Sequence, residues 1–508
     1  MTEAGQVLDI PFADAFAFDP SPTWAAIRES DRPVVRVRTL TGSHVWLATR
    51  YDHVRLILSD PRFSRAAVVA DGAPRAGVSR PLSNTLPTTD PPEHTRLRRL
   101  VSGVFAPRRV EALRPAIREL AGRLADDVAA AGQGADLRQL FALPLPIQVI
   151  CSMLGVPYAD REAFREWTEL AYSMEVSERA RVESAMGSLV GYMTDLVVRK
   201  RIAYRRGAHG SVAVAGAATK ASHDADAVTA RGGDTDAVTN TVTNAVTDTD
   251  AVADADTGVV GNTATDGVAA DDTVAATGTV TTAVAGTDTV GTAVADTDAV
   301  ESAVAGGIRD SAHDHAEDTG GDLLDELCRT ALTDDELVAF ALNLLVAGHE
   351  TSANQITSFV ATLLRDPALW DRLVRDPGLL PSAVEELMRV TRLSDVGQLR
   401  IAKQDVELGG VTVRAGEGVM ASIGAANRDP RVFPDPDTVR LDRAPNPHLA
   451  LGVGIHFCLG AQLARIELGE ALSVLINRFP RLRPARPIED LAWRRVLVSG
   501  LAELPVLP

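Results

Sequence analysis

Cysteine is scarce in this chain of 508 residues, which contains only Cys151, Cys328 and Cys458. Three widely spaced cysteines do not make the paired framework of a small disulfide-stabilised protein. Such usage is typical of a reducing compartment, so we expect a cytoplasmic protein.

Long apolar runs are also missing. No uninterrupted apolar stretch reaches the length of about 18 residues that a membrane-spanning helix requires. Residues 1–20 lack the basic start and apolar run of a signal peptide. We therefore expect no membrane association, and we expect no nucleic-acid partner.

Large apolar side chains are almost absent from one segment. Residues 211–320 contain no Phe, Trp, Tyr, Leu or Pro, and they repeat short units such as Thr-Asp-Ala-Val. This segment holds 19 acidic and 3 basic residues, so its net charge is −16. The net charge of the whole chain is −17, which leaves the remaining chain almost neutral at −1. It cannot bury enough apolar surface to offset the entropy lost on ordering. We predict a disordered, low-complexity surface insert over 208–320, although the recurring Val and Thr leave a small β-solenoid as an alternative.

Without this insert, residues 1–207 and 321–508 form about 400 residues, enough for one large domain that encloses a cofactor. Hydrophobic periodicity predicts a mainly α-helical chain with a minor β component. A hairpin is expected around Thr41-Gly42, and Asp90 is expected to cap the helix that carries His94 and Arg98. A capping box at Thr333-Asp-Asp-Glu336 begins a long apolar helix that ends near Arg365.

The most informative segment is the glycine-rich stretch 451–460, which holds Cys458 just before a helix predicted over Ala461–Phe479. The positive end of that helix and nearby backbone N–H groups would stabilise a metal-binding thiolate. Gly452 and Gly454 would allow sharp bends and the close approach of a flat cofactor. Gly460 would allow close packing where the helix begins.

The long apolar helix is interrupted by a short polar segment at 347–351. Gly348 would let the helix open or kink, so that backbone carbonyls and the Thr351 hydroxyl face a ligand. A helix that simply becomes amphipathic near its end would explain the same pattern.

These segments resemble those of the cytochrome P-450 family, the heme-thiolate monooxygenases, and in particular its bacterial, actinomycete-like members. The pattern Gly452-x-Gly454-x-His456-x-Cys458-x-Gly460 is similar to the heme-ligand loop of that family. One position differs, because Leu451 stands where the family usually has Phe. The resemblance implies a P-450-like fold around heme b, with Cys458 as the metal ligand.

The resemblance also implies roles for further residues. Gly348, Glu350 and Thr351 match the oxygen-activation motif, in which the threonine hydrogen-bonds dioxygen and the carboxylate delivers protons. The heme propionates would be held by cationic side chains: His94, Arg98, Arg400 and His456. A structural brace of the ligand loop would consist of Glu386, Arg389 and Arg443.

The implied function is insertion of one oxygen atom of O2 into a lipophilic small molecule, by hydroxylation or epoxidation, in secondary-metabolite tailoring. A ferredoxin and its reductase would supply electrons to a monomeric enzyme. An arginine-rich run over 96–118 would steer the acidic ferredoxin to the enzyme. Xenobiotic oxidation and a non-catalytic heme protein are alternatives. A zinc hydrolase that uses His448, His456 and Cys458 is another, although their spacing matches no common zinc pattern.

Overall fold

The computed structural model describes residues 7–12, 21–76, 83, 85–171, 179–224, 322–391, 393–394, 397–494 and 498–508. The chain divides into two units, one formed by Met1–Ala218 with Asp318–Pro508 and the other by Thr219–Glu317. The architecture below is that of the first unit.

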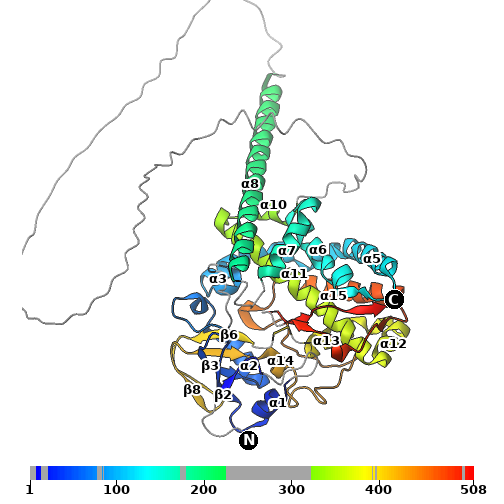
Figure 1. The fold of residues 1–508 in the computed structure, drawn as a ribbon. Coiled ribbons are helices and arrows are strands. Elements are labelled where there is room, and N and C mark those ends of the chain that lie inside the picture. The colour runs from blue at the N-terminus through cyan, green and yellow to red at the C-terminus, as the bar shows by residue number, and fades with distance from the viewer. Residues whose placement is uncertain are drawn as a thin grey trace, which may run out of the picture. The chain divides into compact units, whose positions relative to one another are not determined.

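Helices dominate this unit, and the expected mainly α fold with a minor β part is confirmed (Figure 1). The helices are α1 Pro22–Glu29, α2 Tyr51–Ser59, α3 Glu93–Ser102, α4 Pro107–Ala112, α5 Arg114–Ala131, α6 Pro144–Leu154, α7 Arg161–Ala171, α8 Arg179–Asp224, α10 Leu323–Leu327, α11 Asp334–Arg365, α12 Pro367–Arg375, α13 Leu380–Val390, α14 Ile423–Ala426 and α15 Ala461–Arg478. None of the described helices is long and apolar enough to cross a membrane.

Helix α11 forms the centre of the helical part (Figure 1). The predicted capping box is present, since the Thr333 side chain accepts from the Glu336 N–H and the Glu336 carboxylate accepts from the Thr333 N–H. These bonds satisfy N–H groups that the first turn leaves without helical partners. Helix α11 packs against α6 and α15, and its buried apolar side chains join the largest hydrophobic cluster.

The β component is gathered around a mixed sheet with the strand order β1-β2-β3-β9-β6-β4. Its strands are β1 Leu8–Asp9, β2 Val34–Arg38, β3 His44–Ala48, β4 Phe63–Ser64, β6 Gln398–Ala402 and β9 Gly418–Ala421. The predicted hairpin is confirmed by the antiparallel pairing of β2 and β3, with Val37 opposite Val45. Smaller sheets are formed by β5 Ala135–Asp136, β7 Val406–Leu408, β8 Val411–Val413, β10 Arg483–Pro484, β11 Trp493–Arg494, β12 Gly500–Leu501 and β13 Pro505–Leu507.

The predicted cap at Asp90 is wrong. Helix α3 begins at Glu93 after Pro92, without a side-chain cap. The Asp90 carboxylate instead accepts hydrogen bonds from the Ser64 hydroxyl at 2.6 Å and from the Arg65 N–H at 2.9 Å. A carboxylate that binds the end of β4 therefore fastens this strand to the segment before α3.

Helix α8 continues to Asp224, and the bounds of the insert, 208–320, stay a prediction. Residues 225–320 lie outside the described residues. On either side of the insert the chain is held together by ion pairs. Lys200 of α8 pairs with Asp322 and Asp325, and Arg201 pairs with Asp334 at 2.9 Å.

These ion pairs lead to a prediction for a variant in which residues 208–320 are deleted. We expect it to fold and bind heme like the full chain, because Lys200, Arg201 and their partners remain in place. The measurement is heme content per protein, together with the red-shifted Soret band of the reduced, carbon-monoxide-treated protein. A colourless deletion variant would show that the insert is part of the domain.

Candidate active site

The loop that carries Cys458 is closed by its own backbone. The Cys458 N–H donates to the Leu451 carbonyl at 2.9 Å, and the short helix Gly454–His456 lies between them. Gly452 and Gly454 have φ angles of 74° and 76°, in the left-handed region that favours glycine. A Cβ on Gly454 would lie 3.0 Å from the Ser59 Cα, so this glycine lets the loop approach α2 closely.

Gly460 plays a different part from the one expected. A Cβ on this residue would meet no protein atom within 4 Å, so no close protein packing requires a glycine there. Its backbone N–H instead lies near the Cys458 sulfur and acts to lower the pKa of that thiol. Leu451, where the resembling family usually has Phe, is partly buried against the main hydrophobic cluster.

Cys458 differs from the other two cysteines because it is exposed, whereas Cys151 and Cys328 are buried. Surrounding protein atoms partly desolvate its thiol, and this raises its pKa. The Gly460 N–H and the charges of Arg98 and Arg465 act in the opposite direction. This cysteine is therefore both accessible and surrounded by groups that favour a thiolate.

The four predicted cationic residues converge on one region. The rings of His94 and His456 stack edge-on with centroids 4.4 Å apart, and the His94 Nε2 has no hydrogen-bond partner among the described residues. Burial and the charges of Arg400 and His94 lower the pKa of His456 to about 3. Arg98 lies close enough to Cys458 for the two charges to interact.

Arg400 is 2% exposed and forms no ion pair within the described ranges. Burial, and the nearby charge of Arg65, lower the pKa of this guanidinium to about 9. A buried arginine without an anion is costly, because desolvation is then not compensated. The donor-rich region around Arg400 therefore fits a cofactor with carboxylate groups, such as the propionates of heme b. Arg65 was not predicted from the sequence, since it belongs to no motif.

Helix α11 carries Gly348, Glu350 and Thr351. The helix is continuous from Asp334 to Arg365. A Cβ on Gly348 would lie 2.9 Å from the Ile150 Cδ1, so the glycine allows α6 to pack closely against α11. The Thr351 hydroxyl donates to the Ala347 carbonyl at 2.6 Å.

Glu350 is fully buried within a charged cluster that the sequence did not reveal. Its Oε1 accepts from Arg494 at 2.8 Å, from Arg138 at 3.3 Å and from the Asn354 amide at 3.2 Å. Its Oε2 has no hydrogen-bond partner among the described residues. The two arginines come from segments more than 140 residues away in sequence.

A second buried carboxyl group lies behind the same turn of α11. Glu467 of α15 accepts a hydrogen bond from the Ser352 hydroxyl at 2.7 Å. Complete burial raises the pKa of Glu467 to about 8, so its side chain holds a proton at neutral pH.

The three residues of the predicted brace lie in contact. Arg389 donates to both Glu386 oxygens at 2.8 Å, and the Arg443 Nε lies 3.0 Å from both. The two guanidinium groups also donate to backbone carbonyls, including those of Pro434 and Pro436. Helix α13 is thereby fixed to the irregular chain that leads into the Cys458 loop.

The adjacent Glu385 makes a parallel set of contacts. It accepts from Arg465 at 2.7 Å and lies 3.0 Å from the His448 Nε2. These partners outweigh burial and lower the pKa of Glu385 to about 2. Arg465 in turn lies close enough to interact with the charge of Cys458.

Comparison with known proteins decides the family. The family model "Cytochrome P450" matches residues 378–492. Nocardicin C N-oxygenase of Nocardia uniformis subsp. tsuyamanensis is 36% identical and the match covers 98% of this chain and 97% of that protein. Cytochrome P450 107B1 of Saccharopolyspora erythraea is 33% identical, with 99% of each chain covered. The chain belongs to the cytochrome P450 family.

Solved P450 structures agree with this assignment. The mixed-function P450 MycG superposes with a TM-score of 0.71 at 33% identity, and the match covers 99% of this chain and all of that one. The protein is accordingly a P450 monooxygenase that contains heme b with an axial cysteine thiolate. This overturns the zinc-hydrolase alternative, and the described residues contain no cluster of three or more His, Cys, Asp or Glu side chains that could hold a metal.

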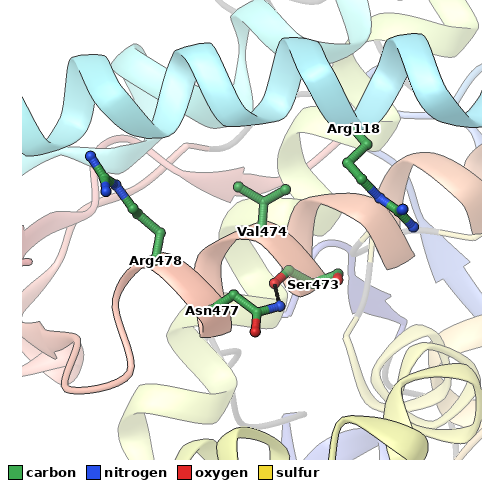
Figure 2. A pocket seen from close by; sticks show the side chains of 5 residues that line it. All are labelled: Arg118, Ser473, Val474, Asn477 and Arg478. Carbon is green, nitrogen blue, oxygen red and sulfur yellow. Dashed lines mark hydrogen bonds between the residues drawn. The ribbon is translucent and has the colours of Figure 1, made fainter.

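A surface groove of about 550 Å³ lies away from these residues, between α5 and α15 (Figure 2). It is lined by Arg118, Ser473, Val474, Asn477 and Arg478. Its two arginines are already engaged, since Arg118 pairs with Glu470 and Arg478 pairs with Asp126. The groove shares no residue with the predicted site.

The Glu386 cluster yields a stability prediction. Replacement of Arg443 by Ala should destabilise the protein by about 3–5 kcal/mol, because a buried glutamate then loses one of its partners. The measurement is the free energy of unfolding in urea. The matched control is Arg372→Ala, which breaks an exposed pair with Asp442 and should change stability by about 0.5 kcal/mol or less. Equal effects would contradict the brace.

Glu467 yields a prediction about pH. The folded protein keeps the Glu467 proton up to about pH 8, whereas the unfolded chain releases it near the ordinary pKa of 4.5. Between these values the folded state binds more protons, so wild-type stability falls as pH rises. Glu467→Gln should remove this loss, and its stability relative to wild type should improve by at least about 1 kcal/mol from pH 5 to pH 8.

The control for this titration is Glu470→Gln, one turn further along α15. Its carboxylate binds Arg114 and Arg118, which lower its pKa, so its contribution stays constant between pH 5 and pH 8. A Glu467→Gln protein with the same pH profile as wild type would refute a protonated Glu467.

Proposed function

We propose that this P450 inserts one oxygen atom of O2 into a large lipophilic natural product, with Cys458 as the axial ligand. The observation that supports Cys458 most strongly is its placement. It is the exposed cysteine, and the Gly460 N–H and the charges of Arg98 and Arg465 all act on its sulfur in the direction that favours a thiolate. Heme b, when bound, supplies the redox chemistry that activates O2.

The remaining roles belong to residues on α11 and around the cationic region. Thr351 uses its proton to bind the Ala347 carbonyl, which leaves its oxygen able to accept a hydrogen bond from a substrate or oxygen atom above the helix. Glu350 would supply protons through its buried Oε2, which has no partner among the described residues, while Arg138 and Arg494 keep the carboxylate in position. His94, Arg98, Arg400 and His456 would hold the propionates.

The substrate class is supported by the names of the relatives. One relative, 35% identical, is named mycinamicin IV hydroxylase/epoxidase, and another, 33% identical, is named 20-oxo-5-O-mycaminosyltylactone 23-monooxygenase. We infer a natural-product substrate of comparable size and low polarity, and hence a role in secondary-metabolite tailoring. Three of the segments that we expect to line the substrate pocket are Ala66–Pro87, parts of Asp160–Ser188, and Leu497–Leu501. They include residues outside the described ranges, among them 77–82, 172–178 and 497.

For electron transfer we infer a ferredoxin and its reductase, acting on a monomeric cytoplasmic enzyme. The arginine-rich run over 96–118 is less basic than expected, because several of its members form ion pairs with glutamates: Arg96, Arg109, Arg114 and Arg118. Arg99 and Arg108 have no ion-pair partner in the described part of the chain. They are the charges of this run that remain available to steer an acidic carrier.

The test combines a spectrum with turnover. Reduced wild-type protein treated with carbon monoxide should give the red-shifted Soret band of thiolate-ligated heme, and Cys458→Ser should abolish this band. The control Cys328→Ser, in the buried core, should keep it. A Cys458→Ser protein with an unchanged band would refute the assignment of the ligand.

A second variant separates an oxygenase from a passive heme protein. Thr351→Ala should retain the spectrum but lower the yield of product per NADPH by at least about tenfold, since proton delivery is impaired. The assay supplies a ferredoxin, its reductase and compounds that shift the heme band. A wild-type protein that neither consumes NADPH nor forms product with any compound that shifts the heme band would contradict the proposed oxygenase.

A further inference from the structure

Two arginines from distant segments meet at a single carbonyl group. The Arg65 Nη1 and the Arg400 Nη1 each donate to the Leu399 oxygen at 3.1 Å. The two nitrogen atoms are therefore separated by no more than twice that distance. Arg65 also donates from Nε to the Pro87 carbonyl at 3.0 Å, which fixes the orientation of its guanidinium group.

Like charges so close together require an anion. Six arginines are buried in the described part of the chain: Arg28, Arg138, Arg389, Arg400, Arg428 and Arg443. Each of them except Arg400 lies within 4.0 Å of a carboxylate. Arg65, which is partly buried beside Arg400, likewise forms no ion pair with a described residue. Arg400 thus differs from the other buried arginines of the described residues, because it has no carboxylate partner.

One carboxylate, Asp90, lies near these arginines. It binds the Arg65 backbone N–H at 2.9 Å and the Ser64 hydroxyl at 2.6 Å, rather than either guanidinium group. Arg65, Arg98 and Arg400 contribute three positive charges to this region. Asp90 and the two propionates of heme b would contribute three negative charges, so the charges balance only if Arg65 is included.

We propose that Arg65 is a fifth propionate-binding residue, which pairs with a heme carboxylate beside Arg400 and completes the charge balance of the cofactor site. This inference rests on the heme b assignment and on none of the proposed substrates. Carbonyl contacts hold Arg65 through Nε and Nη1, and Nη2 has no partner among the described residues. A positively charged donor therefore remains for the carboxylate.

The test compares Arg65→Gln and Arg65→Lys with wild-type holoprotein. Arg65→Gln should release heme to apomyoglobin about tenfold faster, because one charge-assisted hydrogen bond is lost. It should also lower the reduction potential of the heme, since loss of a positive charge favours the ferric state. Arg65→Lys keeps the charge and should restore most of the potential.

Removal of a nearby negative charge, which should compensate for the lost arginine, provides a sharper criterion. Asp90→Asn removes a negative charge and should raise the potential, and the double variant Arg65→Gln/Asp90→Asn should return it close to the wild-type value. The matched control is Arg62→Gln, three residues earlier, where the arginine is exposed and pairs with Asp60. It should change neither the potential nor the rate of heme release.

Two results would overturn the inference without touching the proposed function. One is an Arg65→Gln protein that unfolds more easily but has the wild-type potential, since Arg65 would then only support the Pro87 and Leu399 carbonyls. The other is an equal shift in Arg65→Gln and Arg65→Lys. A wild-type protein that binds no thiolate-ligated heme would instead refute the function itself.

Discussion

A thiolate at Cys458 is the charge around which the rest of this structure is arranged. An anionic sulfur is unstable beside an apolar core, and the fold places positive potential on several sides of it. The Gly460 N–H lies at the start of α15, Arg465 lies further along the same helix, and Arg98 comes from α3. Because α3 and α15 are more than 350 residues apart in sequence, this arrangement exists only when the whole domain is folded.

Two consecutive glutamates of α13 keep these positive groups in place. Glu386 binds Arg389 and Arg443, and so fixes the chain that precedes the ligand loop. Glu385 binds Arg465 and His448, and so fixes a guanidinium group close to the sulfur. The two carboxylates occupy neighbouring faces of one helix turn. A single short helix therefore sets both the position of the loop and part of its electrostatic potential.

The sequence predicted those features that depend on local chemistry. The β2–β3 hairpin and the capping box at Thr333 follow from residues only a few positions apart, and the structure contains both. Prediction from the sequence failed where a side chain could bind either a local or a distant partner. Asp90 looked like a helix cap, but its carboxylate binds Ser64 and Arg65.

The charged clusters behind α11 were missed for the same reason. The two arginine partners of Glu350 lie 212 and 144 residues away, and the serine that binds Glu467 lies 115 residues away. No periodic pattern or motif connects such residues. A single signal was available at Glu467, since a glutamate within a mostly apolar stretch of α15 must either pair with a cation or hold a proton.

The size of the insert raises the question of how the domain tolerates it. The entropy of closing a flexible loop grows only with the logarithm of its length, so even a fully flexible connection of about 100 residues costs about 3 kcal/mol more than one of five. Several contacts near the insert oppose that cost. Lys200 pairs with Asp322 and Asp325, and Arg201 donates to the carbonyls of Cys328 and Leu332 as well as to Asp334. Because these contacts lie within the domain, the residues that surround Cys458 can be held in place whatever the length of the chain between α8 and α10.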